Sequence, residues 1–266
     1  MSEKWTLEQI RQFWTEQAQR HGKSYAASWS DQPVIEMEIR QILGWLADGD
    51  RILDVGCANG YSTIQFAASK QVVIRGIDYI PEMIEQANLR LVDLQDRLLG
   101  KVSFDVGDIT ALNEPAEEYD KVIVIRVLIN LGNWQNQVRG LQECIRVLKP
   151  QGLLLLSEAT LQGWTQLNKF RREWGLSDIP MPPFNQYVDQ EEVAQAVQPR
   201  LELLDIINFS SSYFVATRVL KPLLIQALGA NIDAANPDME WNRWSAQLPP
   251  AGDYGTQKLF VFQKMS

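Results

Sequence analysis

The stretch RILDVGCANGYST, residues 51–63, decides the fold of this chain. It reads as a short apolar strand, a tight turn of small residues and the start of a helix. The small residues of the turn predict that a ligand can closely approach its backbone N–H groups. A second apolar segment, 72–77, ends in Asp78, and a carboxylate at that point can accept hydrogen bonds from two ribose hydroxyls. These features predict a nucleoside pocket at the carboxyl edge of a parallel sheet.

Two common nucleotide-binding loops do not fit this turn. The dinucleotide fingerprint G-x-G-x-x-G fails because, counted from Gly56, Ala58 and Tyr61 stand at its second and third glycine positions. The phosphate-binding pattern G-x-x-x-x-G-K-[ST] does not match either. The remaining pattern is D-x-G-x-A-x-G, in which Asp54 comes from the strand. An acid at that place suits a ligand with a positively charged amino group rather than a pyrophosphate.

This pattern resembles the first motif, (D/E)-x-G-x-G-x-G, of the class I S-adenosylmethionine-dependent methyltransferases, with Ala58 in place of the middle glycine. Three later segments are similar to the same family. VSFDVGDI (102–109) resembles its adenine-binding corner, YDKVIVIR (119–126) its fourth strand, and RVLKPQGLLLLSE (146–158) its helix-turn-strand signature. The four motifs keep the family's order and spacing over roughly residues 50–160.

The resemblance implies S-adenosylmethionine as cofactor and S-adenosylhomocysteine as product. It places Asp78 on the ribose, the 56–60 turn beside the amino-acid tail, and Asp108 with Ile109 at the adenine. The expected cofactor-binding residues are Asp54, Gly56, Cys57, Ala58, Gly60, Asp78, Tyr79, Met83, Gly107, Asp108, Ile109 and Arg126. Purely structural readings stay open for some of them: the small residues could serve only the turn, Asp108 could cap the next turn, and Cys57 could pack beneath it.

The amino-acid composition limits the classes of partner that we expect for this chain. Lys and Arg number 25 against 33 acidic residues, a net charge of −8, whereas nucleic-acid-binding proteins usually carry a basic surface. Two cysteines cannot form a disulfide framework, as is typical of a reducing compartment. The amino terminus lacks an apolar signal region, and no run approaches the roughly 18 apolar residues that span a bilayer. We therefore expect a cytoplasmic protein with neither a nucleic-acid nor a membrane partner.

Strand and helix patterns alternate from residue 51 to residue 158, which is typical of a parallel sheet with helices on both faces. The expected strands are 51–55, 72–77, 101–105, 119–127 and 152–158, and the expected helices are 61–69, 81–97 and 134–148. The fold class is thus α/β. The resemblance implies a seven-stranded, mostly parallel, doubly wound sheet whose last strand runs antiparallel.

The flanking segments are expected to complete one domain, 1–266. A capping box at Thr6 predicts a helix that ends near Gly22, and Pro33 opens a second helix, so 1–48 forms a helical lid. Residues 49–158 form the cofactor core, and 159–266 supply substrate-side elements and the final strands. The later elements are a helical piece within 160–190, a helix at 190–198, strands at 201–209 and 256–263, and helices at 215–228 and 237–248 in an insertion between those strands.

Four residues are candidates for catalysis: His21, Tyr25, Asn130 and Tyr187, with Glu158 as a further possible base. His21 is the single histidine, yet its place beside Gly22 also suits a helix C-terminus. Tyr25 falls in a segment that relatives lay over the cofactor, although it could be ordinary packing. Asn130 follows the fourth strand, where this fold sets its reacting atoms. No metal ligands are expected.

Motifs after the fourth and fifth strands narrow the class of molecule that could accept the methyl group. Enzymes of this fold that methylate DNA or protein amides carry N/D-P-P-Y/F after the fourth strand, where this chain has RVLIN (126–130). The later PPF at 182–184 is expected to be a lid or wall element, and Asp31 to cap the following helix. The basic residues Lys169, Arg171 and Arg172 could hold an acidic substrate group or form a solvated helix face.

The resulting hypothesis is methyl transfer to a small-molecule acceptor, at oxygen or nitrogen, by in-line displacement. One alternative is a cyclase or lyase that attacks the cofactor within itself and releases methylthioadenosine, as in azetidine-2-carboxylate formation. The other is a non-catalytic nucleoside-binding protein. The acceptor, the use of a base and the oligomeric state stay open.

Overall fold

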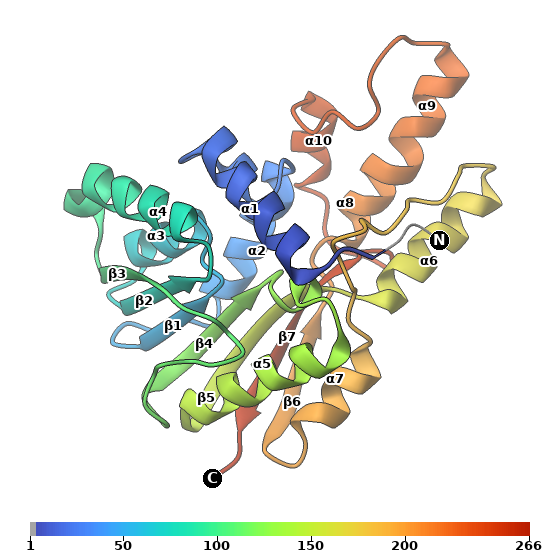
Figure 1. The fold of residues 1–266 in the computed structure, drawn as a ribbon. Helices are drawn as coiled ribbons and strands as arrows, with labels where there is room; N and C mark the ends of the chain where they lie inside the picture. Colours follow the sequence, from blue (N-terminus) through green and yellow to red (C-terminus); the bar gives the residue numbers. More distant parts are fainter. Residues whose placement is uncertain (1–3) are drawn as a thin grey trace.

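The computed structural model describes residues 4–266, so the first three residues of the expected lid, 1–48, lie outside the described part of the chain. It contains a seven-stranded sheet in the order β3-β2-β1-β4-β5-β7-β6 (Figure 1). Strands β1 to β5 pair in parallel, and β7 runs antiparallel to both β5 and β6. The strands are β1 (Arg51–Val55), β2 (Val73–Asp78), β3 (Lys101–Val106), β4 (Tyr119–Ile125), β5 (Leu148–Ala159), β6 (Leu201–Ile207) and β7 (Gln257–Lys264). The predicted fold class is confirmed.

The strand order reverses at β1, which lies between β2 and β4. Parallel registers bring Asp54 opposite Gly76 on one side and Ile123 on the other. Open α/β sheets bind their ligands outside the carboxyl ends of the strands at such a reversal. The turn after β1, the end of β2 and the turn after β4 therefore meet at one edge.

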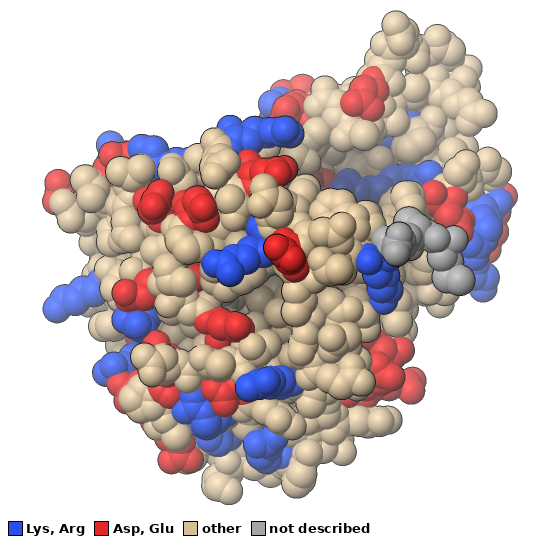
Figure 2. Space-filling view, in the orientation of Figure 1, with Lys and Arg blue, Asp and Glu red and all other residues tan. Residues whose placement is uncertain are grey.

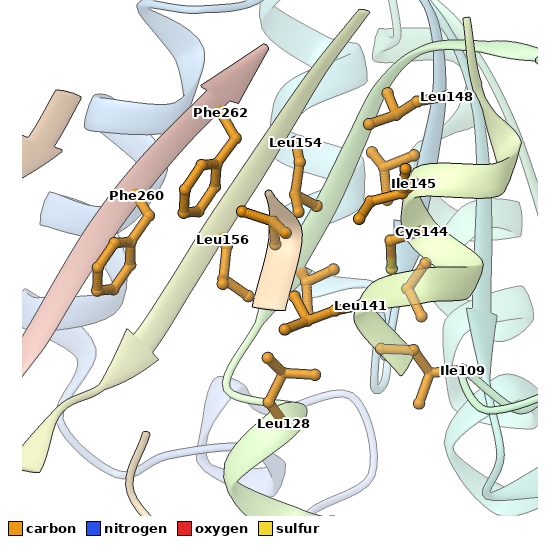
Figure 3. Close-up of a cluster of buried hydrophobic side chains, with 14 of the residues drawn as sticks. Ile109, Leu128, Leu141, Cys144, Ile145, Leu148, Leu154, Leu156, Phe260 and Phe262 are labelled. Carbon is orange, nitrogen blue, oxygen red and sulfur yellow. The ribbon is translucent and has the colours of Figure 1, made fainter. Parts of the chain in front are cut away.

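Helices cover both faces of the sheet. Helix α5 (Trp134–Val147) and α7 (Gln190–Val197) pack on one face, and α2 (Gln32–Leu43) and α3 (Tyr61–Ser69) on the other. Figure 3 shows Leu141, Cys144 and Ile145 of α5 turned toward the leucines of β5. Cys144 is fully buried there, so its predicted core position is confirmed. The remaining α-helices are α1 (Leu7–His21), α4 (Pro81–Leu94), α6 (Leu161–Glu173), α8 (Ser211–Val215), α9 (Lys221–Leu228) and α10 (Glu240–Ser245).

Several predicted helices end or divide differently. The helix expected over 81–97 is α4 followed by a short 3-10 turn, η2 (Gln95–Arg97). The helix expected over 215–228 divides into α8, a π-helical turn, η4 (Ala216–Leu220), and α9. Pro222 lies in the first turn of α9, where its missing N–H costs no helical hydrogen bond. None of the helices within residues 4–266 combines the length and apolar character that crossing a bilayer requires.

The insertion between β6 and β7 is tied to the amino-terminal segment. Asp31 precedes α2, but its side chain makes no cap hydrogen bond, so the predicted capping role is wrong. Its carboxylate instead accepts a hydrogen bond of 2.6 Å from the Tyr213 hydroxyl and forms an ion pair with Arg218 of the π-helical turn. A buried carboxylate is drawn to these two donors because they satisfy its charge. Beyond this contact α9 projects from the body of the molecule (Figure 1).

Candidate active site

A cavity of about 580 Å³ opens at the carboxyl edge of the sheet, beside the reversal at β1. Its size lies within the usual range of small-molecule sites, about 300–1,000 Å³. The wall includes eleven of the twelve predicted cofactor residues: Asp54, Gly56, Cys57, Ala58, Asp78, Tyr79, Met83, Gly107, Asp108, Ile109 and Arg126. It also includes His21, Asn130 and Tyr187. Within the described part of the chain, Gly60 and Tyr25 are not part of this wall.

The turn after β1 has left-handed backbone at Gly56 (φ +72°) and at Ala58 (φ +47°). Its amides already have partners inside the protein. Those of Gly56 and Cys57 donate to the Ile77 carbonyl at 2.7 and 2.9 Å, and that of Ala58 donates to Asp78 at 2.9 Å. The close approach of a ligand to these amides stays a prediction, and a ligand would meet them already bonded within the protein.

Gly60 serves packing. It is also left-handed, at φ +72°, and a Cβ atom there would come within 2.6 Å of the Phe104 ring. Phe104 belongs to β3 and packs with Cys57 and Ala87 in a small cluster beneath the turn. Glycine at this position thus allows α3 to begin close against the sheet. The packing role considered for Cys57 is confirmed, although Cys57 also borders the cavity.

Two buried carboxylates line the cavity from adjacent strands, Asp54 from β1 and Asp78 from the end of β2. Burial raises the pKa of Asp54 to about 7, while a 2.6 Å hydrogen bond from the Thr63 hydroxyl acts in the opposite direction. Burial likewise raises the pKa of Asp78 to about 6, opposed by backbone hydrogen bonds that include one of 2.9 Å from Ile80. A bound cation would favour the ionised forms of both groups. The pair is therefore suited to a ligand that carries positive charge.

The corner after β3 combines both roles considered for Asp108. Its Oδ1 accepts hydrogen bonds of 2.8 Å from the Thr110 amide and hydroxyl, so it does cap the turn. Asp108 and Ile109 also line the cavity, together with Gly107. Ile109 is 5% exposed and packs into the core beneath α5, which leaves an apolar surface for a flat ring.

The turn after β4 carries an arginine whose side chain pairs with a buried glutamate. Arg126 has φ +55°, pairs with the fully buried Glu38 of α2, and lies 5.1 Å from the centre of the Trp29 ring. Glu38 also accepts hydrogen bonds from Ser157 and, at 3.0 Å, from Gln257. Sequence reasoning missed Glu38, although it falls on the apolar face of its helix, which is an unusual place for an unpaired carboxylate.

Glu158 supports the same turn without reaching the cavity. Its Oε1 accepts hydrogen bonds of 2.8 and 2.7 Å from the amides of Val127 and Leu128. Burial raises its pKa to about 8. Because Glu158 is not among the described residues of the wall, its geometry is that of a support for the turn rather than of a base.

The segment 182–187 closes the far side of the cavity, as the prediction of a wall element required. Phe184 stacks on Phe13 of α1 with ring centres 4.6 Å apart. The Gln186 amide donates to the Ile129 carbonyl at 2.7 Å, and the Gln137 side chain donates to the Gln186 carbonyl at 2.8 Å. Asn185, which the sequence analysis did not single out, also lines the wall.

The other predicted site residues lie elsewhere. Tyr25 packs edge-on against Tyr61, with ring centres 6.0 Å apart, on the α2 side of the sheet. Arg172 pairs with Asp178 at 2.8 Å, and Arg171 donates to the Ser177 carbonyl at 2.8 Å. Neither arginine borders the cavity among the described residues, nor does Lys169. Over residues 4–266, no group of three or more His, Cys, Asp or Glu side chains could hold a metal ion.

Comparison with known proteins places this geometry in context. A family model described as "Methyltransferase domain" matches residues 46–195. The chain is 32% identical over 118 residues to the 27-O-demethylrifamycin SV methyltransferase of Amycolatopsis mediterranei, covering 44% of this chain and 41% of that protein. It is 32% identical over 129 residues to the uncharacterized methyltransferase YdaC of Bacillus subtilis, covering 48% and 65%. The chain therefore matches less than two thirds of the length of these relatives.

A solved structure shares the fold over most of both chains. It is the magnesium protoporphyrin IX methyltransferase of Synechocystis PCC 6803 with bound S-adenosylhomocysteine. The TM-score is 0.58 at 13% identity, and the alignment covers 91% of this chain and 88% of that one. This likeness concerns the fold alone.

Proposed function

The chain belongs to the family of methyltransferase domains, and on that premise we propose that it transfers a methyl group from S-adenosylmethionine to a small-molecule acceptor. The observation that carries the proposal is the cavity, whose wall divides into an acidic part and an uncharged aromatic part. The three acids of the wall, Asp54, Asp78 and Asp108, all fall in the predicted cofactor set. Phe13, Phe184 and Tyr187 of the aromatic part lie outside that set and would contact the acceptor.

The residues present fit this cofactor. Asp54 would receive the positively charged amino group of the amino-acid tail, and the 56–58 turn would lie beside that tail. Asp78 would receive the ribose hydroxyls, and Asp108 with Ile109 would receive the adenine. Tyr79, Met83 and Gly107 would complete the adenosine side. When bound, the cofactor supplies an electrophilic methyl carbon attached to a positively charged sulfur.

The chain's own contribution is positioning. Holding the accepting atom in line with the methyl group can lower the barrier by roughly 7–11 kcal/mol. Turn residues held by Glu38 and Glu158 fix Arg126 and Asn130 at the cavity. The bound cofactor would supply the methyl carbon to the acceptor atom, and its sulfur would keep the electron pair of the broken carbon–sulfur bond. Where that atom carries a proton, His21 is the imidazole in the cavity wall that could accept it.

We propose that the chain is a single domain whose three segments have the roles that the sequence predicts. Residues 49–158 would bind the cofactor, 1–48 would form its lid, and 159–266 would supply the acceptor side. The placement of α1 and of Phe184 in the cavity wall supports this division.

A small-molecule acceptor is favoured over nucleic acid. The net charge is −8, and acidic and basic side chains are interspersed on the face shown in Figure 2. Nucleic-acid sites usually gather basic residues into a patch. The rifamycin relative, whose name gives a small molecule as the compound that is methylated, points the same way.

The cyclase or lyase alternative needs a pocket with no room for an acceptor. The cavity wall also includes Phe13, Phe184 and Tyr187, which lie outside the cofactor set, and this favours intermolecular transfer. Purified protein incubated with S-adenosylmethionine alone, followed by mass spectrometry, separates the two reactions. We expect the cofactor to persist, and S-adenosylhomocysteine with a methylated product to form only when an acceptor is added. Enzyme-dependent methylthioadenosine at catalytic turnover would contradict the proposal.

A further inference from the structure

Three aromatic side chains pack together in the cavity wall and form an aromatic box, in which Trp14 also belongs to the cluster that contains Tyr79 and Met83. Phe13 and Trp14 come from α1, and Phe184 comes from the 182–187 wall. The rings of Phe13 and Phe184 are stacked at 4.6 Å with a 24° interplanar angle. Trp14 stands nearly perpendicular to both, at 5.0 Å from Phe13 and 5.9 Å from Phe184. Mutual packing fixes these rings, so they present rigid apolar faces, which favour another aromatic ring in offset or edge-on contact.

Neutral polar groups accompany this box in the wall. Asn185 donates from Nδ2 to the Asn130 Oδ1 at 3.0 Å, and Asn130 donates to the Arg126 carbonyl at 2.7 Å. These bonds orient the amide of Asn185, whose Oδ1 has no hydrogen-bond partner within residues 4–266. The Tyr187 hydroxyl is also without one in the described chain, and burial raises the pKa of Tyr187 to about 12, so it stays neutral. A ligand hydroxyl could donate a hydrogen bond to the Asn185 Oδ1.

The charged groups of the wall are engaged elsewhere. Its acids fall in the cofactor set, and Arg126 is paired with Glu38. No lysine lines the described wall, and His21 is its single histidine. A carboxylate or phosphate placed in the aromatic box would thus be buried without a free cation to pair with, which is strongly unfavourable.

We propose that the acceptor is a neutral, planar aromatic molecule with a hydroxyl group, and that Asn185 determines specificity by accepting a hydrogen bond from that group. The ring lies against the aromatic box, and the polar group meets the Asn185 amide. This inference rests on the proposed function, because it assumes that the cofactor fills the acidic part of the cavity.

The test uses three probes of similar size in the presence of S-adenosylhomocysteine. These are 2-naphthol, which is neutral, aromatic and hydroxylated; 2-naphthoate, its anionic counterpart; and decahydro-2-naphthol, its saturated counterpart. Calorimetric titration should give 2-naphthol at least a tenfold lower Kd than either of the others. Equal affinity for 2-naphthol and either counterpart would overturn the proposal.

Variants separate the polar contact from the ring contact. Asn185→Leu should weaken 2-naphthol about tenfold, as expected for one lost hydrogen bond, and leave naphthalene, which has no hydroxyl, unchanged. Phe184→Leu should weaken both. Trp174→Ala, at a residue 60% exposed and outside the described wall, should change neither. Equal loss of both ligands in Asn185→Leu would overturn the role of Asn185.

Cofactor affinity keeps the two proposals distinguishable. S-adenosylhomocysteine should bind the wild type and Asn185→Leu equally, which also reports that the variant is folded. If it does not bind the wild type, the proposed function fails, and with it the basis of this inference. If it binds but the three probes do not differ, only the acceptor class fails. If Asn185→Leu does not fold, the same titrations with Asn185→Ala test the role of Asn185. The relative affinities of the three probes for the wild type then test the acceptor class.

Discussion

Gly56 and Ala58 show how single residues shape the turn after β1. Both have positive φ, +72° and +47°, a conformation that costs an L-residue about 1–2 kcal/mol. At Gly56 there is also no space, since a Cβ atom would come within 2.2 Å of the Val127 side chain. Valine is stiff at χ1, so it cannot turn away without moving the turn after β4. The two cavity turns are therefore packed directly on each other.

Replacement of Gly56 tests this packing. Gly56→Ala should lower the free energy of unfolding by about 2–5 kcal/mol, the sum of left-handed strain and overpacking. Ala58→Gly is the matched control, because it relieves strain at the same turn while adding chain entropy, and it should change stability by no more than about 1 kcal/mol. Urea unfolding measures both. Equal stability of Gly56→Ala and the wild type would show that the two turns can separate freely.

Asp54 should show a conflict between stability and binding. Its pKa is raised from 3.8 to about 7 in the folded chain, so the folded state binds more protons than the unfolded state between about pH 4 and pH 7. Stability therefore falls as pH rises through that window. At about pH 8 the free energy of unfolding of Asp54→Asn should exceed that of the wild type by roughly 1–4 kcal/mol, and it should depend less on pH.

The same variant should bind S-adenosylhomocysteine at least about tenfold more weakly, because a charge-assisted hydrogen bond is lost. Thermal unfolding at several pH values and calorimetry measure the two effects. A variant that is less stable than the wild type at about pH 8, yet binds as tightly, would contradict the assigned role of Asp54.

At this scale the sequence predicted the cavity wall well but not its supports. Asp54, Asp78 and Asp108 were found because a local motif places each at a strand end. Glu38, Asn185 and the support role of Glu158 depend on contacts between segments far apart in the chain. No local spacing specifies such contacts. Tyr25 was expected in the wall because of its neighbours in sequence, but its ring packs on Tyr61 instead.

At the scale of elements, two segments cover the cavity, helix α1 and the wall segment 182–187, and they are attached to the core differently. Helix α1 packs on the core through the buried Ala18, which contacts the cluster of Ile80 and Met83, and after its end Asn59 donates to the Gly22 and Ser24 carbonyls at 2.7 Å. The wall segment is bound more firmly, because Gln186 and Val188 donate backbone hydrogen bonds to Ile129 and Ala159 at 2.7 and 3.0 Å. The sequence predicted both covers, although it offered no sign that one is tied to the sheet.

Hydrogen exchange should separate these covers. We expect the amides of α1, residues 7–21, to gain protection when S-adenosylhomocysteine binds, because the helix lies over the cavity and opens locally without ligand. Amides of Gln186 and Val188 should be protected in both states. Equal protection of α1 with and without ligand would show that it is a fixed wall rather than a lid.

Element boundaries in the insertion were predicted less well than those of the core. Core strands and helices follow clear periodic patterns, whereas the helix expected over 215–228 contains a π-helical turn. That turn carries Arg218 toward Asp31, and the guanidinium lies 4.5 Å from the Phe214 ring. Hydrophobic periodicity cannot signal a change of helix type that a distant carboxylate stabilises.

At the scale of the whole molecule, Asp31 joins the amino-terminal segment to the insertion. Asp31→Ala should leave Arg218 without its ion-pair partner and lower the free energy of unfolding by about 3 kcal/mol. Tyr213→Phe removes one hydrogen bond to the same carboxylate and should cost about 1 kcal/mol. Chemical denaturation compares them. A loss below that of Tyr213→Phe would mean that the ion pair does not join these parts.

The proposed function depends above all on one assignment, that the acidic side chains of the cavity wall bind the adenosyl cofactor and that Asp78 binds its ribose. Calorimetric titration of S-adenosylhomocysteine into the wild type and Asp78→Ala tests it most directly. The wild type should bind in the micromolar range, and the variant at least about tenfold more weakly, because hydrogen bonds to a charged group contribute about 1.5–3 kcal/mol each. Unchanged affinity in a folded Asp78→Ala protein would contradict the account.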